Sequence, residues 1–330
     1  MIIHLNELED LTKRAVLKYG YTRKEAETIC AVLLYAQLRG NNQGVVKLVG
    51  PGIPKSSSAG EILMAKEDSS FALVDGNSNH AMLVMDFATE LAKRKAMSTG
   101  IGVVGAFGIS TSSGAIGYYA RKLAESDLVG IVFAGATPVV APEGSSQPVF
   151  GTNPLAIGVP SENGSVVLDM ATAAMPFFGL IEAQLAGRLL PEGFAYDAEG
   201  NDTVDPSVAL QGALRTFDRG RKGSGISFMI QALTGPLVGS SFVGIGDIDH
   251  NWGGHLIIGI DPDRLAGVAS LKDGVGRMVE VVNTAKRHSA IIEVLAPGQR
   301  GDRLAASVLA SGEIDIGDEL YSQLLAVASE

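Results

Sequence analysis

The chain has 330 residues, of which 46% are hydrophobic and 19% charged, so it is long enough to bury a large core divided between two lobes. Its formal net charge of −10 at pH 7 argues against nucleic acids and anionic membranes as partners, because the mean field repels phosphate. Any anion-binding site must therefore be a local exception.

The cysteine content and the opening residues indicate a cellular compartment. The single cysteine, Cys30, excludes an internal disulfide and favours a reducing environment, and its apolar neighbours at helical spacing indicate core packing. The start, MIIHLNELEDL, has early acids and no basic segment, so we expect no signal peptide and a cytoplasmic protein. The uncharged runs 97–120 and 226–246 are broken by Gly, Ser, Thr or Pro, which favours buried elements over membrane spans.

The N-terminal region is predicted to be helical. Apolar residues at helical spacing indicate a helix over residues 5–19. The sequence Thr22-Arg-Lys-Glu25 is a capping box, and it predicts a second helix to about Arg39. Residues 51–70 are rich in Pro, Ser and Gly and contain one short strand-like run, so they mark a candidate lobe boundary.

Strands and helices alternate in the next part of the chain. We expect a strand over residues 71–75 and a helix over 81–97, with His80 at its N-terminus in a structural or surface role. The sequence Gly100-Ile-Gly-Val-Val-Gly105 matches G-x-G-x-x-G. It follows a helix and is itself predicted to be a strand, so it does not qualify as a dinucleotide fingerprint. Residues 128–133 are a continuous apolar run typical of a strand buried on both faces.

A β-hairpin is predicted within residues 155–170. Its two β-branched runs flank Asn-Gly at 163–164, which is a strong short-range hairpin signal. The second strand ends on Asp169, and Thr172 is expected to cap a helix to about Gly187. A carboxylate where a strand meets a helix N-terminus is a natural seat for an anionic ligand whose ribose the carboxylate can hold.

A second candidate anion site follows in residues 219–225, with the sequence RGRKGSG ahead of an apolar helix over 226–237. Because glycine admits close backbone approach and Lys222 adds charge, this turn is the best anion cradle in an acidic chain.

The last third of the chain carries two histidines, His250 and His255, in the sequence HNWGGH. No carboxylate or cysteine follows them at ligand spacing, so we expect no metal site. Residues 271–287 and 316–329 are predicted helices.

Several of these stretches resemble the type-2 malate/L-lactate dehydrogenase family, which includes L-sulfolactate dehydrogenase, 2,3-diketogulonate reductase, ureidoglycolate dehydrogenase and piperideine-2-carboxylate reductase. GTNPLAIGVPS at 151–161 and LDMAT at 168–172 are the most specific, and the similarity runs from about residue 5 to 325. The resemblance implies an α/β fold with a non-Rossmann mixed-sheet NAD(P)-binding domain and a helical second domain. It also implies NAD or NADP, a small-molecule carboxylate substrate, and a homodimer whose active site lies between lobes.

The resemblance also suggests lobe limits and cofactor contacts. Residues 1–70 and about 250–330 would form the helical lobe for dimerisation and substrate, and about 71–249 the mixed-sheet cofactor-binding lobe. The residues expected to contact the cofactor are Thr152, Asn153, Asp169, Met170, Ala171, Thr172, Lys222, Gly223, Gly298, Gln299 and Arg300. Where the family carries PGE, this chain has PGQ at 297–299, so the choice between NAD and NADP stays open.

This chain is an atypical relative, because it lacks both histidines to which the family's acid/base chemistry is assigned. In the block that resembles RGxDSHGVxR, the histidine falls on Gln43 and the arginine on Lys47; in the block that resembles RNxNHFGxAGYYA, Ser112 replaces the histidine and Thr111 the asparagine. An amide cannot exchange a proton near pH 7, so Gln43 is expected only to orient the substrate. Lys47 is expected to pair with a substrate carboxylate as a point charge.

Three functions are compatible with these replacements. In the first, a hydride moves between NAD(P)H and C2 of a 2-oxo or 2-hydroxy acid, and Thr111, Ser112 or Lys47 relays the proton. In the second, the substrate is a cyclic imino acid such as pyrroline-2- or piperideine-2-carboxylate, whose protonated C=N needs no enzymic acid. In the third, the chain is an inactive dinucleotide-binding paralogue.

Overall fold

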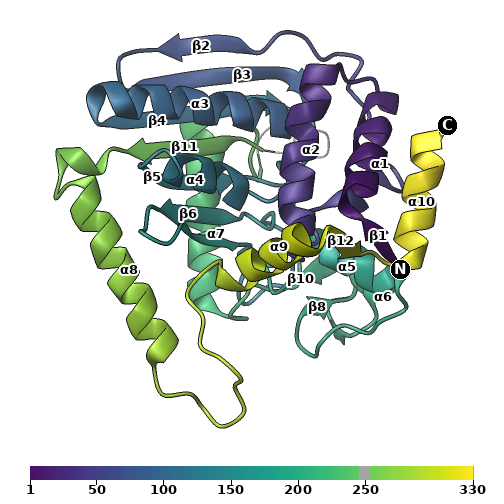
Figure 1. Cartoon of the computed structure of the whole chain (residues 1–330). Helices are drawn as coiled ribbons and strands as arrows, with labels where there is room; N and C mark the ends of the chain where they lie inside the picture. The colour runs from purple at the N-terminus through teal and green to yellow at the C-terminus, as the bar shows by residue number, and fades with distance from the viewer. Residues whose placement is uncertain (245–252, 330) are drawn as a thin grey trace.

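The computed structural model describes residues 1–244 and 253–329, and its centre is a mixed sheet (Figure 1). Seven strands form this sheet in the order β2-β3-β4-β11-β5-β6-β7. Strands β3 and β4 are parallel, and every other neighbouring pair is antiparallel. The strands are β2 (Leu63–Glu67), β3 (Phe71–Asn79), β4 (Ile101–Ile109), β5 (Val129–Ala134), β6 (Leu155–Val159), β7 (Val166–Met170) and β11 (His255–Ile260).

The other elements surround this sheet. Two small sheets join β1 (Ile2–His4) to β12 (Glu313–Asp315), and β8 (Ala195–Tyr196) to β9 (Asp202–Thr203) and β10 (Ala213–Leu214). The α-helices are α1 (Leu5–Lys18), α2 (Arg23–Leu38), α3 (Ala81–Thr99), α4 (Gly117–Ala124), α5 (Phe177–Leu185), α6 (Pro206–Ala209), α7 (Arg221–Thr234), α8 (Val268–Thr284), α9 (Gln299–Ser311) and α10 (Asp318–Ser329). Three 3₁₀ turns are η1 (Val45–Leu48), η2 (Pro236–Val238) and η3 (Pro262–Arg264). None of the described helices has both the length and the apolar character needed to cross a membrane.

The N-terminal helices form as predicted. Thr22 caps α2 through the expected capping box, in which its hydroxyl accepts from the Glu25 amide while the Glu25 carboxylate accepts from the Thr22 amide. Apolar side chains of α1, α2 and η1 join those of α3, α4 and the sheet in one continuous core, for example Leu8, Leu33 and Val104. The helical region and the sheet are therefore packed together rather than separated by a linker.

The centre of the sheet comes from late in the chain. Strand β11 lies between β4 and β5, with Ile257 opposite both Val104 and Val132. Strand β2 pairs with β3 at one edge. Both β2 and β11 fall outside residues 71–249, the range predicted for the sheet lobe, because strand pairing joins segments that are far apart in sequence.

The G-x-G-x-x-G sequence enters β4 from its second residue, as predicted, while Gly100 caps the end of α3, and the glycines within the strand make room for neighbouring elements. A Cβ on Gly102 would lie 2.0 Å from the carbonyl oxygen of Ala92 in α3, and a Cβ on Gly105 would lie 2.7 Å from Val238 Cγ1. These glycines therefore permit close packing on both faces of the strand.

The hairpin is confirmed, and a helix follows it within the predicted range, but it begins later than predicted. Strands β6 and β7 pair with Leu155 opposite Met170, whereas α5 begins only at Phe177. The prediction of a cap at Thr172 was wrong because its hydroxyl donates to the carbonyl oxygens of Thr152 and Asn153, which ties the end of the hairpin to its beginning.

The predicted glycine-rich turn is also partly helical. Helix α7 begins at Arg221, so Lys222 and Gly223 lie in its first turn. The carboxylate of Asp218 accepts from the amides of Gly220 and Gly223, at 3.1 and 3.0 Å. The chain's own acid therefore accepts from two of the backbone amides of this turn.

The histidine pair falls only partly within the described structure. His250 lies outside the described residues, and His255 begins β11. Among the residues that the structure describes, no three His, Cys, Asp or Glu side chains come together in a way that could hold a metal ion.

Gly102→Ala tests the packing role of the β4 glycines. The added methyl group would clash with helix backbone, and overpacking of this kind typically costs ~1–3 kcal/mol, so we expect a lower free energy of unfolding in urea. Gly225→Ala is the matched control, because a Cβ there meets nothing within 4 Å and alanine favours a helix. An unchanged urea midpoint for Gly102→Ala would contradict the packing role.

Candidate active site

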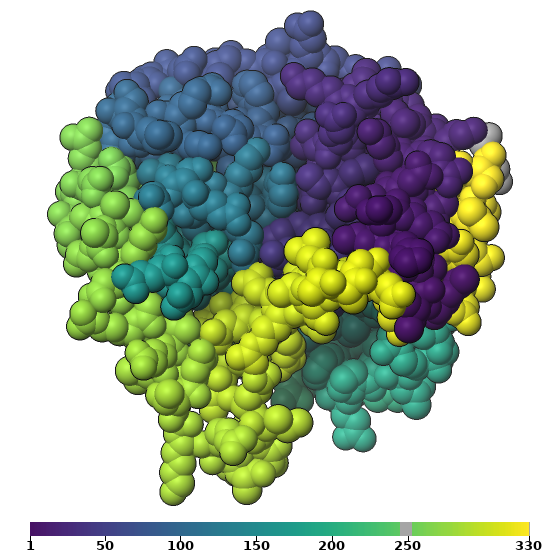
Figure 2. Space-filling view, viewed as in Figure 1, coloured from purple at the N-terminus to yellow at the C-terminus, as the bar shows by residue number. Residues whose placement is uncertain are grey.

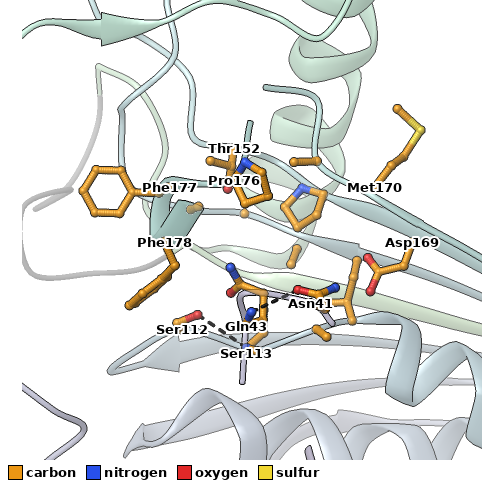
Figure 3. Close-up of a pocket in the computed structure, with 18 of the residues that line it drawn as sticks. Asn41, Gln43, Ser112, Ser113, Thr152, Asp169, Met170, Pro176, Phe177 and Phe178 are labelled. Carbon is orange, nitrogen blue, oxygen red and sulfur yellow. Dashed lines mark hydrogen bonds between the residues drawn. The ribbon is translucent and has the colours of Figure 1, made fainter. Parts of the chain in front are cut away.

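The main candidate site lies at one edge of the sheet, where β4, β5 and β7 end and β6 and β11 begin. A cavity of about 850 Å³ opens there, and because it ends against two phenylalanines we call it the aromatic cavity (Figure 3). Its lining is Asn41, Gln43, Thr111, Ser112, Ser113, Gly114, Ala115, Ile116, Ala134, Gly135, Ala136, Thr137, Val139, Thr152, Pro154, Asp169, Met170, Ala171, Pro176, Phe177 and Phe178. Seven of the residues predicted from sequence meet here: Gln43, Thr111, Ser112, Thr152, Asp169, Met170 and Ala171.

Lys47 lies directly behind the wall of the aromatic cavity. Its side chain is only 2% exposed, and its Nζ donates to Ser112 Oγ at 2.8 Å and lies 3.3 Å from the centroid of the Phe178 ring. No described carboxylate forms an ion pair with it, and burial holds the pKa of Lys47 well below its usual value. The predicted direct contact with a substrate carboxylate is therefore not available in this conformation, because Ser112 and Phe178 cover the ammonium group.

Ser112 connects this lysine to the cavity. Its Oγ accepts from Lys47 Nζ and, at 3.4 Å, from the amide of Gly114. The Ser112 hydroxyl hydrogen has no acceptor among the described residues, so it is free to donate into the aromatic cavity. Thr111 beside it has a buried Oγ1 with no hydrogen-bond partner, and such a group calls for a ligand or an ordered water.

Neutral amides line the next part of the wall. The loop after α2 places Asn41 and Gln43 in the cavity, where Asn41 Oδ1 accepts from the backbone N–H of Gln43 (Figure 3). Gln43 Nε2 also donates to Asn42 Oδ1 at 3.4 Å. The orienting role predicted for Gln43 is compatible with this position, and Asn41 is an additional polar residue that the sequence analysis did not select.

Asp169 stands at the opposite end of the aromatic cavity from the two rings in the view of Figure 3. Its Oδ2 accepts from the Gly117 amide at 2.8 Å, and a Cβ on Gly117 would lie 2.8 Å from the same oxygen. Burial raises the pKa of Asp169 to about 6, although the hydrogen bond from Gly117 lowers it. Oδ1 makes no hydrogen bond within the described structure, so it can accept from a ligand hydroxyl.

Two of the predicted cofactor residues instead hold the site together. Asn153 is fully buried, and its Nδ2 donates to Ser227 and Gln231 of α7. Thr172 is also fully buried and donates to the backbone at Thr152 and Asn153. The side chains of Asn153 and Thr172 therefore fasten the hairpin to α7, although Asn153 Oδ1 is buried without a partner among the described residues. Thr152, Met170 and Ala171 line the cavity.

A second cavity of about 960 Å³ adjoins the first and shares Asn41 and Asp169 with it. We call it the arginine cavity, because Arg39 of the loop after α2, Arg121 of α4 and Arg300 of α9 line it. The predicted residues Gly298 and Arg300 belong to this cavity, whereas Gln299 turns back so that its Oε1 accepts from the Ala296 amide. The sequence analysis missed Arg121, since nothing in its local pattern marks it.

Lys222 and Gly223 line neither of these two cavities. Lys222 is exposed at the start of α7, and Gly223 is buried beside Asp218. Their contact with the cofactor stays a prediction.

Comparison with known proteins shows the family to which the chain belongs. The malate/L-lactate dehydrogenase family matches residues 3–325. L-sulfolactate dehydrogenase of Methanothermobacter thermautotrophicus is 37% identical over 82% of this chain and 78% of its own length. Delta(1)-pyrroline-2-carboxylate/delta(1)-piperideine-2-carboxylate reductase of Pseudomonas syringae pv. tomato is 31% identical over 79% of each chain. The solved sulfolactate dehydrogenase of Methanocaldococcus jannaschii superposes with a TM-score of 0.82 at 27% identity, covering 100% of this chain and 97% of the other.

The chain therefore belongs to the malate/L-lactate dehydrogenase family and has its non-Rossmann mixed-sheet fold. It is an NAD(P)-dependent oxidoreductase, as the sequence resemblance implied. The site fits such a cofactor, because two adjoining cavities meet at a carboxylate with a free oxygen and Thr111 supplies an unpartnered buried hydroxyl.

Asp169→Asn tests the burial of this carboxylate. Because the folded pKa of about 6 lies above the ordinary value of an aspartate, the folded protein binds the proton more tightly than the unfolded chain, and stability falls as the pH rises through this window. We expect this part of the pH dependence to disappear in Asp169→Asn when thermal stability is measured from pH 4 to 7. Asp86→Asn, in an ion pair with Lys122, is the control, and an identical profile for Asp169→Asn and the wild type would contradict the assignment.

Proposed function

We propose that the protein transfers a hydride between NAD(P)H and C2 of a small 2-oxo or 2-hydroxy acid, with Lys47 and Ser112 as its proton relay. The observation that carries this proposal is the buried Lys47, which has no carboxylate partner among the described residues and donates to a serine on the cavity wall. This arrangement replaces the missing histidines by a different donor.

The relay accounts for the proton that carbonyl reduction requires. The cofactor supplies the hydride to C2. As negative charge develops on the substrate oxygen, Ser112 Oγ gives it a proton, and Lys47 Nζ gives a proton to Ser112 Oγ. Lys47 is left neutral, which its apolar surroundings favour, and oxidation of the hydroxy acid reverses each transfer.

Neutral groups are proposed to hold the substrate carboxylate. No lysine or arginine belongs to the described lining of the aromatic cavity, and Lys47 is covered. Asn41, Gln43 and Thr111 supply side-chain donors next to Ser112. The aromatic rings of Phe177 and Phe178 close the same end of the cavity and limit the size of the substrate (Figure 3).

A cyclic imino acid is the second candidate substrate. The similarity to a reductase named for pyrroline-2- and piperideine-2-carboxylate supports it, and so does the loss of both family histidines. A protonated imine needs no proton from the enzyme when it accepts a hydride. Reduction of such a substrate should therefore be independent of the Lys47–Ser112 pair, and this separates the two candidates.

Lys47→Met tests the relay. Methionine fills the apolar space but carries no proton, and loss of a general acid typically costs ~10²- to 10⁴-fold, so kcat for oxo-acid reduction should fall by about 10²-fold or more. The KM should change little, because Nζ does not reach the cavity. In the wild type, kcat for reduction should fall as rising pH deprotonates Lys47, and this fall should be absent in Lys47→Met. Initial rates with NADH and NADPH measure these effects.

Two controls sharpen this experiment. Ser112→Ala should reproduce the loss of kcat, whereas Ser113→Ala, which alters the same wall without touching Lys47, should not. The substrate panel is pyruvate, oxaloacetate, pyrroline-2-carboxylate and piperideine-2-carboxylate. Turnover of imines alone, undiminished in Lys47→Met, would favour the imine reductase; cofactor binding without turnover of any substrate would favour an inactive paralogue.

A homodimer is part of the proposal, and α8 supports it. None of the residues of α8 is buried, and Met278 and Val281 are 67% and 69% exposed. The segment that follows α8 carries Ile292, which is 86% exposed, and it projects beyond the rest of the molecule (Figure 2). Apolar side chains gathered on such an arm favour a partner, and we take that partner to be a second copy.

Val281→Glu tests this interface. A charge placed on the exposed apolar side of α8 would cost free energy on burial, so we expect a shift towards monomers in analytical ultracentrifugation. Val208→Glu is the matched control, since Val208 is a 41% exposed valine on α6. Dissociation by both variants equally, or by neither, would place the interface elsewhere.

We further propose that the protein works in the cytoplasm. Its only cysteine, Cys30, is buried, and burial raises the pKa of this thiol to about 12, which keeps it protonated. A single protonated thiol in a packed core is compatible with a reducing compartment. Detection in a soluble cell fraction tests this assignment.

A further inference from the structure

The arginine cavity is positively charged although the chain carries a net charge of −10. Its charged lining consists of Arg39, Arg121 and Arg300 against Asp302 and Asp169. Even with both carboxylates ionised, the three guanidinium groups leave an excess of positive charge. The cavity is therefore locally positive in a chain of negative net charge, which is the condition that an anionic ligand requires.

One carboxylate of this cavity is already fully engaged. Asp302 accepts from Arg121 Nη2 through both of its oxygens, at 2.6 and 2.7 Å, and from Arg39 Nε at 3.1 Å. The side chain of Gln299, beside the turn, already accepts a hydrogen bond from the Ala296 amide through its Oε1. Neither of these two groups is thus free to accept from the hydroxyls of the adenosine ribose, which is how a free carboxylate recognises NAD. The free Oδ1 of Asp169 lies where the two cavities meet.

Arg300, by contrast, is free. Its guanidinium is exposed and makes no hydrogen bond or ion pair within the described part of the chain. It lies in the first turn of α9, where the amides of Arg300 and Gly301 also have no acceptor among the described residues. An unpaired guanidinium beside free helix amides suits a phosphate group.

The position of Arg300 relative to Asp169 defines which part of a dinucleotide it would meet. Asp169 lines both cavities, whereas Arg300 lines only the arginine cavity. A Cβ on Gly298 would lie 2.8 Å from the carbonyl oxygen of Val167, so the turn before α9 rests against β7 two residues before Asp169. A dinucleotide with its reactive end in the aromatic cavity would pass Asp169 and enter the arginine cavity, which Arg300 lines.

We infer that the arginine cavity selects NADP(H) over NAD(H), with Arg300 and the first amides of α9 holding the 2′-phosphate of the adenosine ribose. This inference rests on the proposed dinucleotide site and adds the identity of the cofactor. Arg39 and Arg121 remain paired with Asp302 and add positive charge around the phosphate.

Direct binding tests this selection without turnover. Titration calorimetry of the full chain with NADPH, NADH, 2′,5′-ADP and 5′-AMP measures the contribution of the 2′-phosphate. Charge-assisted hydrogen bonds typically contribute enough for about a tenfold to hundredfold difference, so NADPH should bind that much more tightly than NADH, and 2′,5′-ADP more tightly than 5′-AMP.

Substitution of Arg300 assigns the effect to this residue. Arg300→Ala should weaken the binding of NADPH and 2′,5′-ADP while leaving the affinity for NADH within about twofold, which removes most of the preference for NADPH. Arg300→Lys should restore part of this preference. Arg303 lies one turn further along α9 and is paired with Glu293. Arg303→Ala should therefore leave the affinities for NADPH and NADH unchanged.

The possible failures are distinguishable. Tighter or equal binding of NADH in the wild type, or an equal loss of both cofactors in Arg300→Ala, would overturn the selection of NADP(H) and leave the proposed hydride transfer intact. Binding of neither dinucleotide would overturn the cofactor site itself, and this inference with it.

Discussion

The site depends on the antiparallel insertion of β11 between β4 and β5. This pairing sets His255, the first residue of β11, level with Ala106 and Ala134 near the ends of its neighbours. The loops after β4 and β5, the start of β6 and the end of β7 consequently meet at one edge of the sheet. Ser112 on the first of these loops and Phe178 of α5 line the same cavity, so the strand pairing sets where the aromatic cavity forms.

Burial of Lys47 is the second constraint, because the proposed proton relay depends on it. An ammonium group in an apolar site loses hydration, and among the described residues one hydroxyl and one aromatic face compensate it. A partner carboxylate would hold the proton in place and raise the pKa. Its absence among the described residues near Nζ makes release of the proton easier, which is what catalysis with a serine intermediary requires.

Local sequence patterns predicted the helices, the hairpin and the strand over the glycine motif, because those elements follow from nearby residues. The errors arose where a distant contact decided the outcome. Thr172 did not cap a helix because its hydroxyl bonds to a carbonyl 20 residues earlier, and α7 begins inside the predicted turn, where Asp218 accepts from the Gly223 amide. The pairing of Lys47 with Ser112 spans 65 residues, so alignment selected both residues but could not show that they touch.

The remaining histidines strengthen the case for the lysine. His80 is buried, and its Nδ1 accepts from the Met82 amide at the start of α3, while His255 is buried in the centre of the sheet. Burial lowers the pKa of each to about 3, so neither takes up a proton near neutral pH. His4 and His288 are exposed and line neither of the two cavities. Within the described structure, these histidines therefore leave the proposed proton transfer at the aromatic cavity to Lys47 through Ser112.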